Sequence, residues 1–287
     1  MHANLYALGA IALWATLATL GVSLAHVPPF LLTGLALVIG SVPAWPRVRE
    51  WRVAPSTLAL GIYGLFAYHF LLFMALRTAP AVEANLVNYL WPLLIVVLAP
   101  VILPGFTLHL RHVLAALAGF AGAAIAILGG RETSGTWSWG YLAALAAAFI
   151  WSTYSLGTRR VAPFPTAAIG LFGLVSGLLA LACHAMFEPA VQLTARDGLL
   201  IAIAGLGPLG AAFFLWDKAL KLGDPRQIGI LSYLTPFAST LLLMLITGRM
   251  PTWSIAFSAL LIIGAAIVGT REPQSANKAE GSSASTT

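Results

Sequence analysis

Residues 83–92, with the sequence EANLVNYLWP, begin a long hydrophobic run and carry polar and aromatic side chains where aliphatic ones would suit a bilayer. Asn85, Tyr89 and Pro92 are spaced i, i+4, i+7, so they share one face of a helix. A proline inside a helix removes one hydrogen bond and presses on the carbonyl four residues earlier, here that of Asn88. We therefore expect a kinked helix whose freed backbone oxygen is satisfied by protein or lines a wet cavity.

The same pattern occurs again in the second half of the chain. Residues 89–92 (YLWP) match residues 233–236 (YLTP), and Ser232 stands where Asn88 stood. Two further pairs follow the same order along the chain: Trp-x-Thr at 14–16 and 151–153, and Gly-Ala-Ala-Ile at 122–125 and 264–267. These matches indicate an internal duplication.

The composition is that of an integral membrane protein. Hydrophobic residues make up 60% of the 287 residues and charged residues only 8%, whereas about 25% is usual in soluble domains. The net charge of +6 does not indicate nucleic-acid binding, because the basic residues lie scattered at the ends of apolar runs. A single cysteine, Cys183, excludes an intrachain disulfide. The first apolar run is too long for a signal peptide and has no basic segment before it, so we interpret it as an uncleaved first span.

The apolar runs predict an all-α integral membrane fold. A helix needs roughly 20 apolar residues to cross the hydrocarbon layer. By that rule we expect ten transmembrane helices, at about 3–22, 28–45, 56–76, 81–103, 110–129, 138–158, 165–187, 198–218, 226–247 and 252–270. Residues 272–287 are polar and are expected to form a disordered tail.

The distribution of basic residues predicts the orientation. With a cytoplasmic N-terminus, eleven of the 15 lysines and arginines fall in inner loops and in the tail. The outer loops then hold only Arg77, Arg131, Arg196 and Arg249. An excess of Lys and Arg marks cytoplasmic loops, so both termini are expected in the cytoplasm.

The duplication divides the ten spans into five plus five. The first repeat is expected at residues 1–130 and the second at 131–271. Because five is odd, the second half enters the membrane from the opposite side, which makes the two halves an inverted repeat. Many secondary transporters have this arrangement and bind substrate near the midplane, at the interface between the repeats.

Signatures of enzymes and cofactor sites are missing from the chain. It has no His/Cys cluster with metal-ligand spacing and no nucleotide-binding motif, so we expect no metal, no cofactor and no enzymatic activity. A serine and a histidine could meet inside the bundle as a protease pair, but no local sequence supports one.

Aromatic and amide side chains in the middle of spans are the candidate substrate-binding groups. Interfacial belts place Trp and Tyr at span ends, so the mid-span residues Trp14, Tyr68, His69, Tyr89, Trp91, Trp151, Tyr154 and Tyr233 need another reason. Helix packing is the alternative for any one of them. Together with Asn85, Asn88 and Ser232 they favour an aromatic-lined cavity. Its rings suit flat solutes or an ammonium group, and its amides and hydroxyls suit the charged ends of a zwitterion.

His69 is the ionisable group in the middle of a span. Such residues are functional candidates; the alternative is a neutral imidazole hydrogen-bonded within the bundle. No Asp or Glu falls at a midplane in the predicted spans. Proton- or sodium-coupled carriers usually keep a carboxylate there, so we expect facilitated diffusion.

The ten spans, the five-plus-five repeats and the proline-bearing spans 4 and 9 resemble the EamA branch of the drug/metabolite transporter superfamily. Residues 88–92 (NYLWP), with Tyr68-His69 ahead of them, resemble the YddG-type subgroup, which exports aromatic amino acids. The resemblance covers the whole chain except the tail. It implies a bacterial inner-membrane exporter with a central cavity formed by spans 3, 4, 8 and 9 and parts of 1 and 6. It also implies cavity-lining roles for Tyr68, His69, Tyr89, Trp91, Trp151 and Ser232.

The sequence therefore predicts a monomeric carrier that exports amino acids by alternating access, with Pro92 and Pro236 as hinges. Its partners are the small-molecule substrate and the lipid bilayer. One alternative is a carrier for another metabolite, such as a drug-like cation or a nucleotide sugar; the latter would call for basic residues that the mid-spans lack. The alternative of another class is a membrane-embedded enzyme or scaffold.

Overall fold

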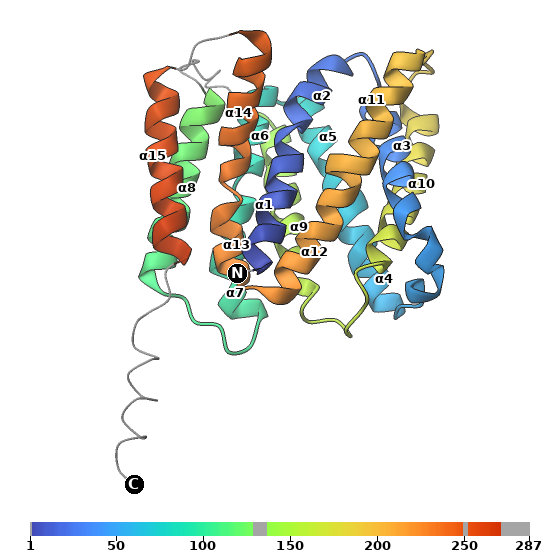
Figure 1. The fold of residues 1–287 in the computed structure, drawn as a ribbon. Helices are drawn as coiled ribbons and strands as arrows, with labels where there is room; N and C mark the ends of the chain where they lie inside the picture. The colour runs from blue at the N-terminus through green and yellow to red at the C-terminus, as the bar shows by residue number, and fades with distance from the viewer. Residues whose placement is uncertain (1, 129–136, 249–251, 271–287) are drawn as a thin grey trace, which may run out of the picture.

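The computed structural model describes residues 2–128, 137–248 and 252–270, and within them every regular element is a helix. Figure 1 shows these helices side by side in one bundle. The helices of the first half are α1 (His2–Ala15), α2 (Leu17–Ser23), α3 (Pro29–Ser41), η1 (Val42–Trp51), α4 (Pro55–Ile62), η2 (Tyr63–Ala67), α5 (Tyr68–Thr78), α6 (Ala81–Asn88), α7 (Trp91–Ile102) and α8 (Leu110–Leu128). Those of the second half are α9 (Gly140–Gly157), α10 (Ala168–Phe187), α11 (Ala195–Leu206), η3 (Gly207–Ala211), α12 (Ala212–Leu222), α13 (Pro225–Leu231), α14 (Leu234–Thr247) and α15 (Trp253–Thr270).

Several of these helices join end to end into membrane-length segments. In the part of the chain that the structure describes, nine segments are long and apolar enough to cross a membrane: His2–Ser23, Pro29–Trp51, Pro55–Thr78, Ala81–Ile102, Leu110–Leu128, Ala168–Phe187, Ala195–Leu222, Pro225–Thr247 and Trp253–Thr270. They fall where nine of the ten predicted spans were expected, so the protein is a multi-pass membrane protein. We call the end of the bundle where α1 begins the N-terminal end, which is lower in Figure 1, and the other the opposite end.

The remaining predicted span corresponds to α9. Near its start, the Ser138 hydroxyl donates to the carbonyl of Thr78, the last residue of α5, at the opposite end. Just after its end, Arg159 donates to the carbonyl of Gly223 at 2.7 Å, next to the last residue of α12 and at the N-terminal end. The 18 residues of α9 reach about 27 Å at 1.5 Å per residue, so α9 runs from one end of the bundle to the other.

The predicted kink in span 4 is a full interruption. α6 ends at Asn88 and α7 begins at Trp91, with Tyr89 and Leu90 in a turn between them. Pro92 therefore lies in the first turn of α7, where its missing N–H removes no helical hydrogen bond. The second repeat of the motif has the same arrangement, with α13 ending at Leu231 and α14 beginning at Leu234.

Two π-helical turns were not predicted. One is η2 between α4 and α5, and the other is η3 between α11 and α12, so each lies in the middle of its membrane-length segment. A π turn adds a residue to a helical turn and often marks a functional site. These two turns come directly before helices that carry cavity residues.

Close backbone contacts at glycines hold α3 against the segment around η3. A Cβ atom added at Gly40 would lie 2.6 Å from the carbonyl oxygen of Gly205 and 2.8 Å from Cα of Gly210. Backbone atoms cannot turn aside as a flexible side chain can, so Gly40→Ala forces the helices apart. We expect this change to lower the free energy of unfolding by roughly 1–3 kcal/mol, measured as a lower Tm of the purified protein in detergent.

The matched control for this prediction is Gly264→Ala on α15, where an added Cβ would have no atom within 4 Å. We expect its Tm to equal that of the unmodified protein. Equal Tm values for Gly40→Ala and Gly264→Ala would show that the helices separate without cost at this contact.

Candidate functional site

A cavity of about 460 Å³ lies inside the bundle and is lined from both halves of the chain. Eight of the ten predicted substrate-binding residues line it: Trp14, Tyr68, His69, Asn85, Asn88, Tyr89, Trp91 and Trp151. The lining also reaches Gly21 of α2 and Leu76 of α5, which lie near the opposite end of the bundle. None of the lining residues lies in the loops at the N-terminal end. The cavity therefore occupies the middle and the opposite end of the bundle.

The cavity carries no formal charge from acidic or basic side chains. Its 24 lining residues, all within the described part of the chain, include no Asp, Glu, Lys or Arg. The polar groups are amides, hydroxyls, phenols and one imidazole. A bound molecule with charged ends would therefore meet dipoles rather than counter-ions.

Trp14, Trp91 and Trp151 line the cavity toward the N-terminal end, and Trp216, which does not line it, packs against them. We call these four residues the tryptophan floor. The ring of Trp14 lies 6.5 Å from that of Trp91, 5.9 Å from that of Trp151 and 5.3 Å from that of Trp216. Two of the indole N–H groups have hydrogen-bond partners: Trp14 donates to the carbonyl of Pro208 and Trp216 to the hydroxyl of Ser155, both at 3.1 Å. The ring faces are left for packing against one another and against a solute.

The polar groups above this floor are oriented by their own hydrogen bonds. His69 Nδ1 lies 2.5 Å from the carbonyl oxygen of Leu65. A carbonyl can only accept, so Nδ1 carries the proton and Nε2 of the neutral ring is an acceptor. Asn88 Nδ2 donates to the Tyr68 hydroxyl at 3.2 Å, which leaves the Tyr68 proton available for another acceptor.

Two predicted substrate-binding residues are not among those that line the cavity. Ser232 is fully buried, and its hydroxyl donates to the carbonyl of Ile228. Tyr233 is fully buried with its ring against Gly119, in a smaller cluster between α7, α8, α13 and α15. The structure therefore groups both with the packing of the second interrupted helix. Tyr154, a further mid-span aromatic residue, likewise packs against Gly64 and does not line the cavity.

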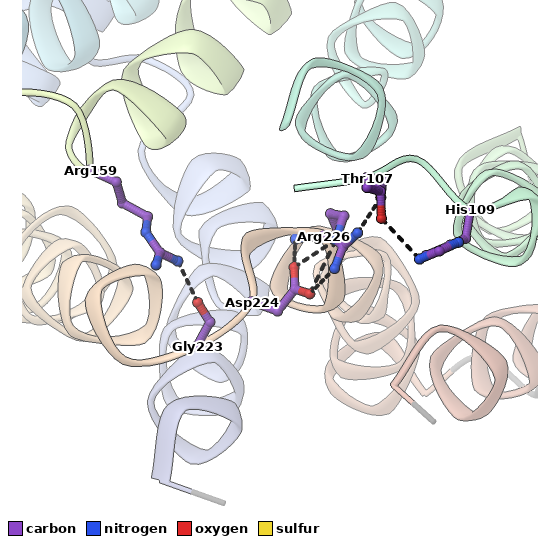
Figure 2. A network of polar contacts seen from close by, with 6 residues as sticks. All are labelled: Thr107, His109, Arg159, Gly223, Asp224 and Arg226. Carbon is purple, nitrogen blue, oxygen red and sulfur yellow. Dashed lines mark hydrogen bonds and ion pairs between the residues drawn. The ribbon is translucent and has the colours of Figure 1, made fainter. Parts of the chain in front are cut away.

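Polar contacts join several loops at the N-terminal end, as Figure 2 shows. The guanidinium of Arg226, on α13, pairs with Asp224 at 2.5 Å and donates to the carbonyl of Thr107 in the loop between α7 and α8. Arg159, after α9, donates to Gly223. We call this set, with His109 bonded to the Thr107 hydroxyl, the Arg226 network.

Phe106 connects the two arginines of the Arg226 network. The guanidinium carbons of Arg159 and Arg226 lie 5.4 and 5.1 Å from the centre of its ring, within the range of cation–π attraction. Partial burial raises the pKa of Asp224, but the hydrogen bonds from Arg226 outweigh this and leave the pKa below its usual value. The carboxylate is therefore ionised at neutral pH, and loops from both halves are held together.

Comparison with known proteins gives the family. The EamA-like transporter family matches residues 1–128 and 138–270. The chain belongs to this family. A relative from Ancylobacter novellus, called "Aromatic amino acid exporter YddG", is 42% identical over 278 residues, covering 93% of this chain and 96% of the relative. A relative of the same name from Escherichia coli is 26% identical, with 93% and 96% covered.

A solved structure, described as "Crystal structure of protein", is 41% identical to the chain. It matches with a TM-score of 0.86 and covers 93% of this chain and 97% of its own. The predicted superfamily resemblance is confirmed, and so is the prediction that the chain is a transporter rather than an enzyme, because the relatives are exporters in a transporter family.

Sequence reasoning missed several groups in or next to the cavity, among them Trp216 and Thr235. Trp216 lies close to the predicted end of span 8, where aromatic residues are usually interfacial, whereas α12 continues to Leu222 and brings Trp216 into the floor. Thr235 lines the cavity, although it sits inside the repeated YL-x-P motif in place of a tryptophan. Comparing the two copies of the motif position by position would have identified Thr235.

Proposed function

We propose that the protein exports amino acids, aromatic ones included, across the bacterial inner membrane by alternating access through the cavity. The observation that carries this proposal is a charge-free cavity lined by Trp14, Trp91 and Trp151 inside a membrane bundle. Its volume lies within the ≈ 300–1,000 Å³ usual for small-molecule sites. Relatives in two bacteria are named as exporters of aromatic amino acids.

The architecture of this carrier is an inverted repeat of ten transmembrane helices, with α9 as the tenth. Three features support the repeat: the family matches each half of the chain separately, a π turn interrupts one segment in each half, and a YL-x-P break interrupts another. The repeats are residues 1–130 and 131–271. An even number of membrane crossings places the start of α1 and the end of α15 at the same end of the bundle, as in Figure 1.

The bias of basic residues assigns the N-terminal end to the cytoplasm, together with both termini. The cavity, which extends to the opposite end, then opens toward the outside. The cytoplasmic half is closed by the tryptophan floor and, beyond it, by the Arg226 network. Export requires the reverse state, in which these two layers part and the opposite end closes.

The interrupted helices are the points at which the halves bend. Pro92 and Pro236 each lie in the first turn after a break, α6/α7 and α13/α14. The breaks leave turns in which backbone angles can change without the loss of a continuous helix. Pro92 and Pro236 are accordingly the hinge residues of the proposed motion, and a monomer suffices because one chain contributes all the cavity residues.

The cargo follows from the lining. Aromatic rings and amides with no counter-ion suit a zwitterion with a flat apolar side chain, whereas a nucleotide sugar would call for basic groups. A drug-like cation or another small metabolite is the second candidate, because tryptophan rings also attract cations. With no carboxylate in the lining, the carrier works as a facilitator.

The experiment is uptake of labelled tryptophan, threonine and a nucleotide sugar into proteoliposomes, with and without an imposed pH gradient. We expect saturable tryptophan uptake without the gradient and no uptake of the nucleotide sugar. Flux that requires the gradient would contradict the facilitator and implicate His69 or Glu83 in proton transfer. No amino-acid flux under either condition would refute the assignment of the cargo.

A further inference from the structure

Two buried oxygen atoms on cavity residues have no hydrogen-bond partner within the described part of the chain: Asn88 Oδ1 and Thr235 Oγ1. The side chains are almost completely buried, with 4% of Asn88 and 5% of Thr235 exposed. A buried polar group without a partner destabilises a fold. Two such groups on one cavity indicate that a ligand supplies the missing partners.

The helix break explains why the Thr235 hydroxyl is unpaired. Thr and Ser hydroxyls inside helices usually bond the carbonyl four residues earlier. Thr240 and Thr247 on the same helix do so, at 2.8 Å from the carbonyl oxygens of Pro236 and Leu243. The residue four before Thr235 is Leu231, which lies beyond the break between α13 and α14. The break therefore removes the usual acceptor and leaves the hydroxyl available.

Asn88 holds the corresponding place at the other break. It is the last residue of α6, and its Nδ2 donates to the Tyr68 hydroxyl. The Oδ1 atom of the same amide can only accept. One break thus contributes an acceptor to the cavity and the other contributes a hydroxyl that can donate.

We propose that Asn88 and Thr235 bind the backbone end of the transported amino acid. Asn88 Oδ1 accepts hydrogen bonds from the α-ammonium group, and the Thr235 hydroxyl donates to the α-carboxylate. The aromatic side chain of the cargo then lies against the tryptophan rings. This subsite rests on the proposed function, since it assumes that the cargo is an amino acid.

The test compares three ligands that share the indole ring: tryptophan, tryptamine, which lacks the carboxylate, and indole-3-propionate, which lacks the amine. Binding to the purified full chain in detergent is measured for the unmodified protein and for Thr235→Val, which keeps the shape and removes the hydroxyl. We expect Thr235→Val to weaken tryptophan and indole-3-propionate by about ten- to a hundredfold, as for a hydrogen bond to a charged group. Tryptamine binding is expected to remain unchanged.

Asn88→Leu gives the complementary result. It is expected to weaken tryptophan and tryptamine and to leave indole-3-propionate unchanged. Thr240→Val, on the same helix and away from the cavity, is the matched control and should bind all three ligands normally. The Tm of each variant reports its folding.

Two different failures are distinguishable. If the unmodified protein binds tryptophan and Thr235→Val binds all three ligands as tightly, or weakens all three equally, the subsite is overturned and the proposed cargo stands. If the unmodified protein binds none of the three, the proposed function is overturned and the subsite with it.

Discussion

Trp91→Ala is expected to abolish tryptophan transport while leaving folded protein in the membrane. The Trp91 side chain is 5% exposed, lines the cavity and packs edge-on against Trp14 and Trp216, with ring centres 6.5 and 5.6 Å away. Removing it deletes a wall of the site and opens the floor beneath a bound solute. We expect initial uptake by proteoliposomes to fall by more than about a hundredfold, because truncating a buried tryptophan at a binding site costs about 3–4 kcal/mol of binding free energy.

Trp91→Phe and Trp253→Ala are the controls for this variant. Phenylalanine keeps a ring in the floor, so Trp91→Phe should retain part of the transport. Trp253 is 91% exposed, and its replacement should leave transport unchanged, which corrects for the general effect of losing a tryptophan. Normal uptake by Trp91→Ala would remove Trp91 from the transport pathway.

Most of the predicted site residues line the cavity because polar and aromatic side chains interrupt otherwise aliphatic runs there. Trp14, Tyr68, Asn88 and Trp91 stand in the middle of apolar runs, where a purely structural helix would carry aliphatic residues. The duplicated motif predicted the positions of both helix breaks. The helical period and the composition of a segment can be read from neighbouring residues alone, so they were sufficient to predict these helices and their breaks.

Ser232 and Tyr233 show where a local argument fails. The symmetry of the motif predicts equivalent places for Tyr89 and Tyr233, yet Tyr89 lines the cavity and Tyr233 packs on Gly119. The two halves of the bundle are related in sequence but not identical in packing, because α13 and α14 lie against α8 and α15. Which of two related side chains meets the cavity depends on those neighbours, and a single sequence does not report them.

The Arg226 network could not be predicted for the same reason. Thr107, Arg159 and Arg226 lie in three segments far apart in the sequence. In the sequence they read as ordinary basic and polar residues at the cytoplasmic ends of spans. Only their position around Phe106 indicates that they act together.

Arg226→Ala is expected to open the N-terminal end of the carrier. Its guanidinium ties α13, which ends at one helix break, to the loop after α7, the helix that begins at the other break. Because Asp224 and Arg226 remain partly exposed, we discount the ion pair and assign the contacts about 1–2 kcal/mol, a five- to thirtyfold shift in population. The shift should favour the proposed state in which the N-terminal end is open, because these contacts join the loops of both halves at that end.

Accessibility of a single cysteine below the floor measures this shift. Ser155 is fully buried next to Trp216, so Ser155→Cys in a Cys183→Ser background should react slowly with a maleimide. Arg226→Ala should raise the labelling rate in membrane vesicles several-fold. Arg47→Ala, which changes an exposed arginine at the same end, should leave the labelling rate unchanged.

The network should also depend on pH. Since the pKa of Asp224 is lowered, its stabilising charge is present above the ordinary carboxyl range and is lost as the pH falls through the lowered pKa. Acid also slows the thiol itself, because only the thiolate reacts, so the two proteins are compared at the same pH. The labelling rate of the Arg226-containing protein, divided by that of Arg226→Ala, should rise toward one as the pH falls. Equal rates for Arg226→Ala and Arg47→Ala would show that the tryptophan floor alone closes the N-terminal end.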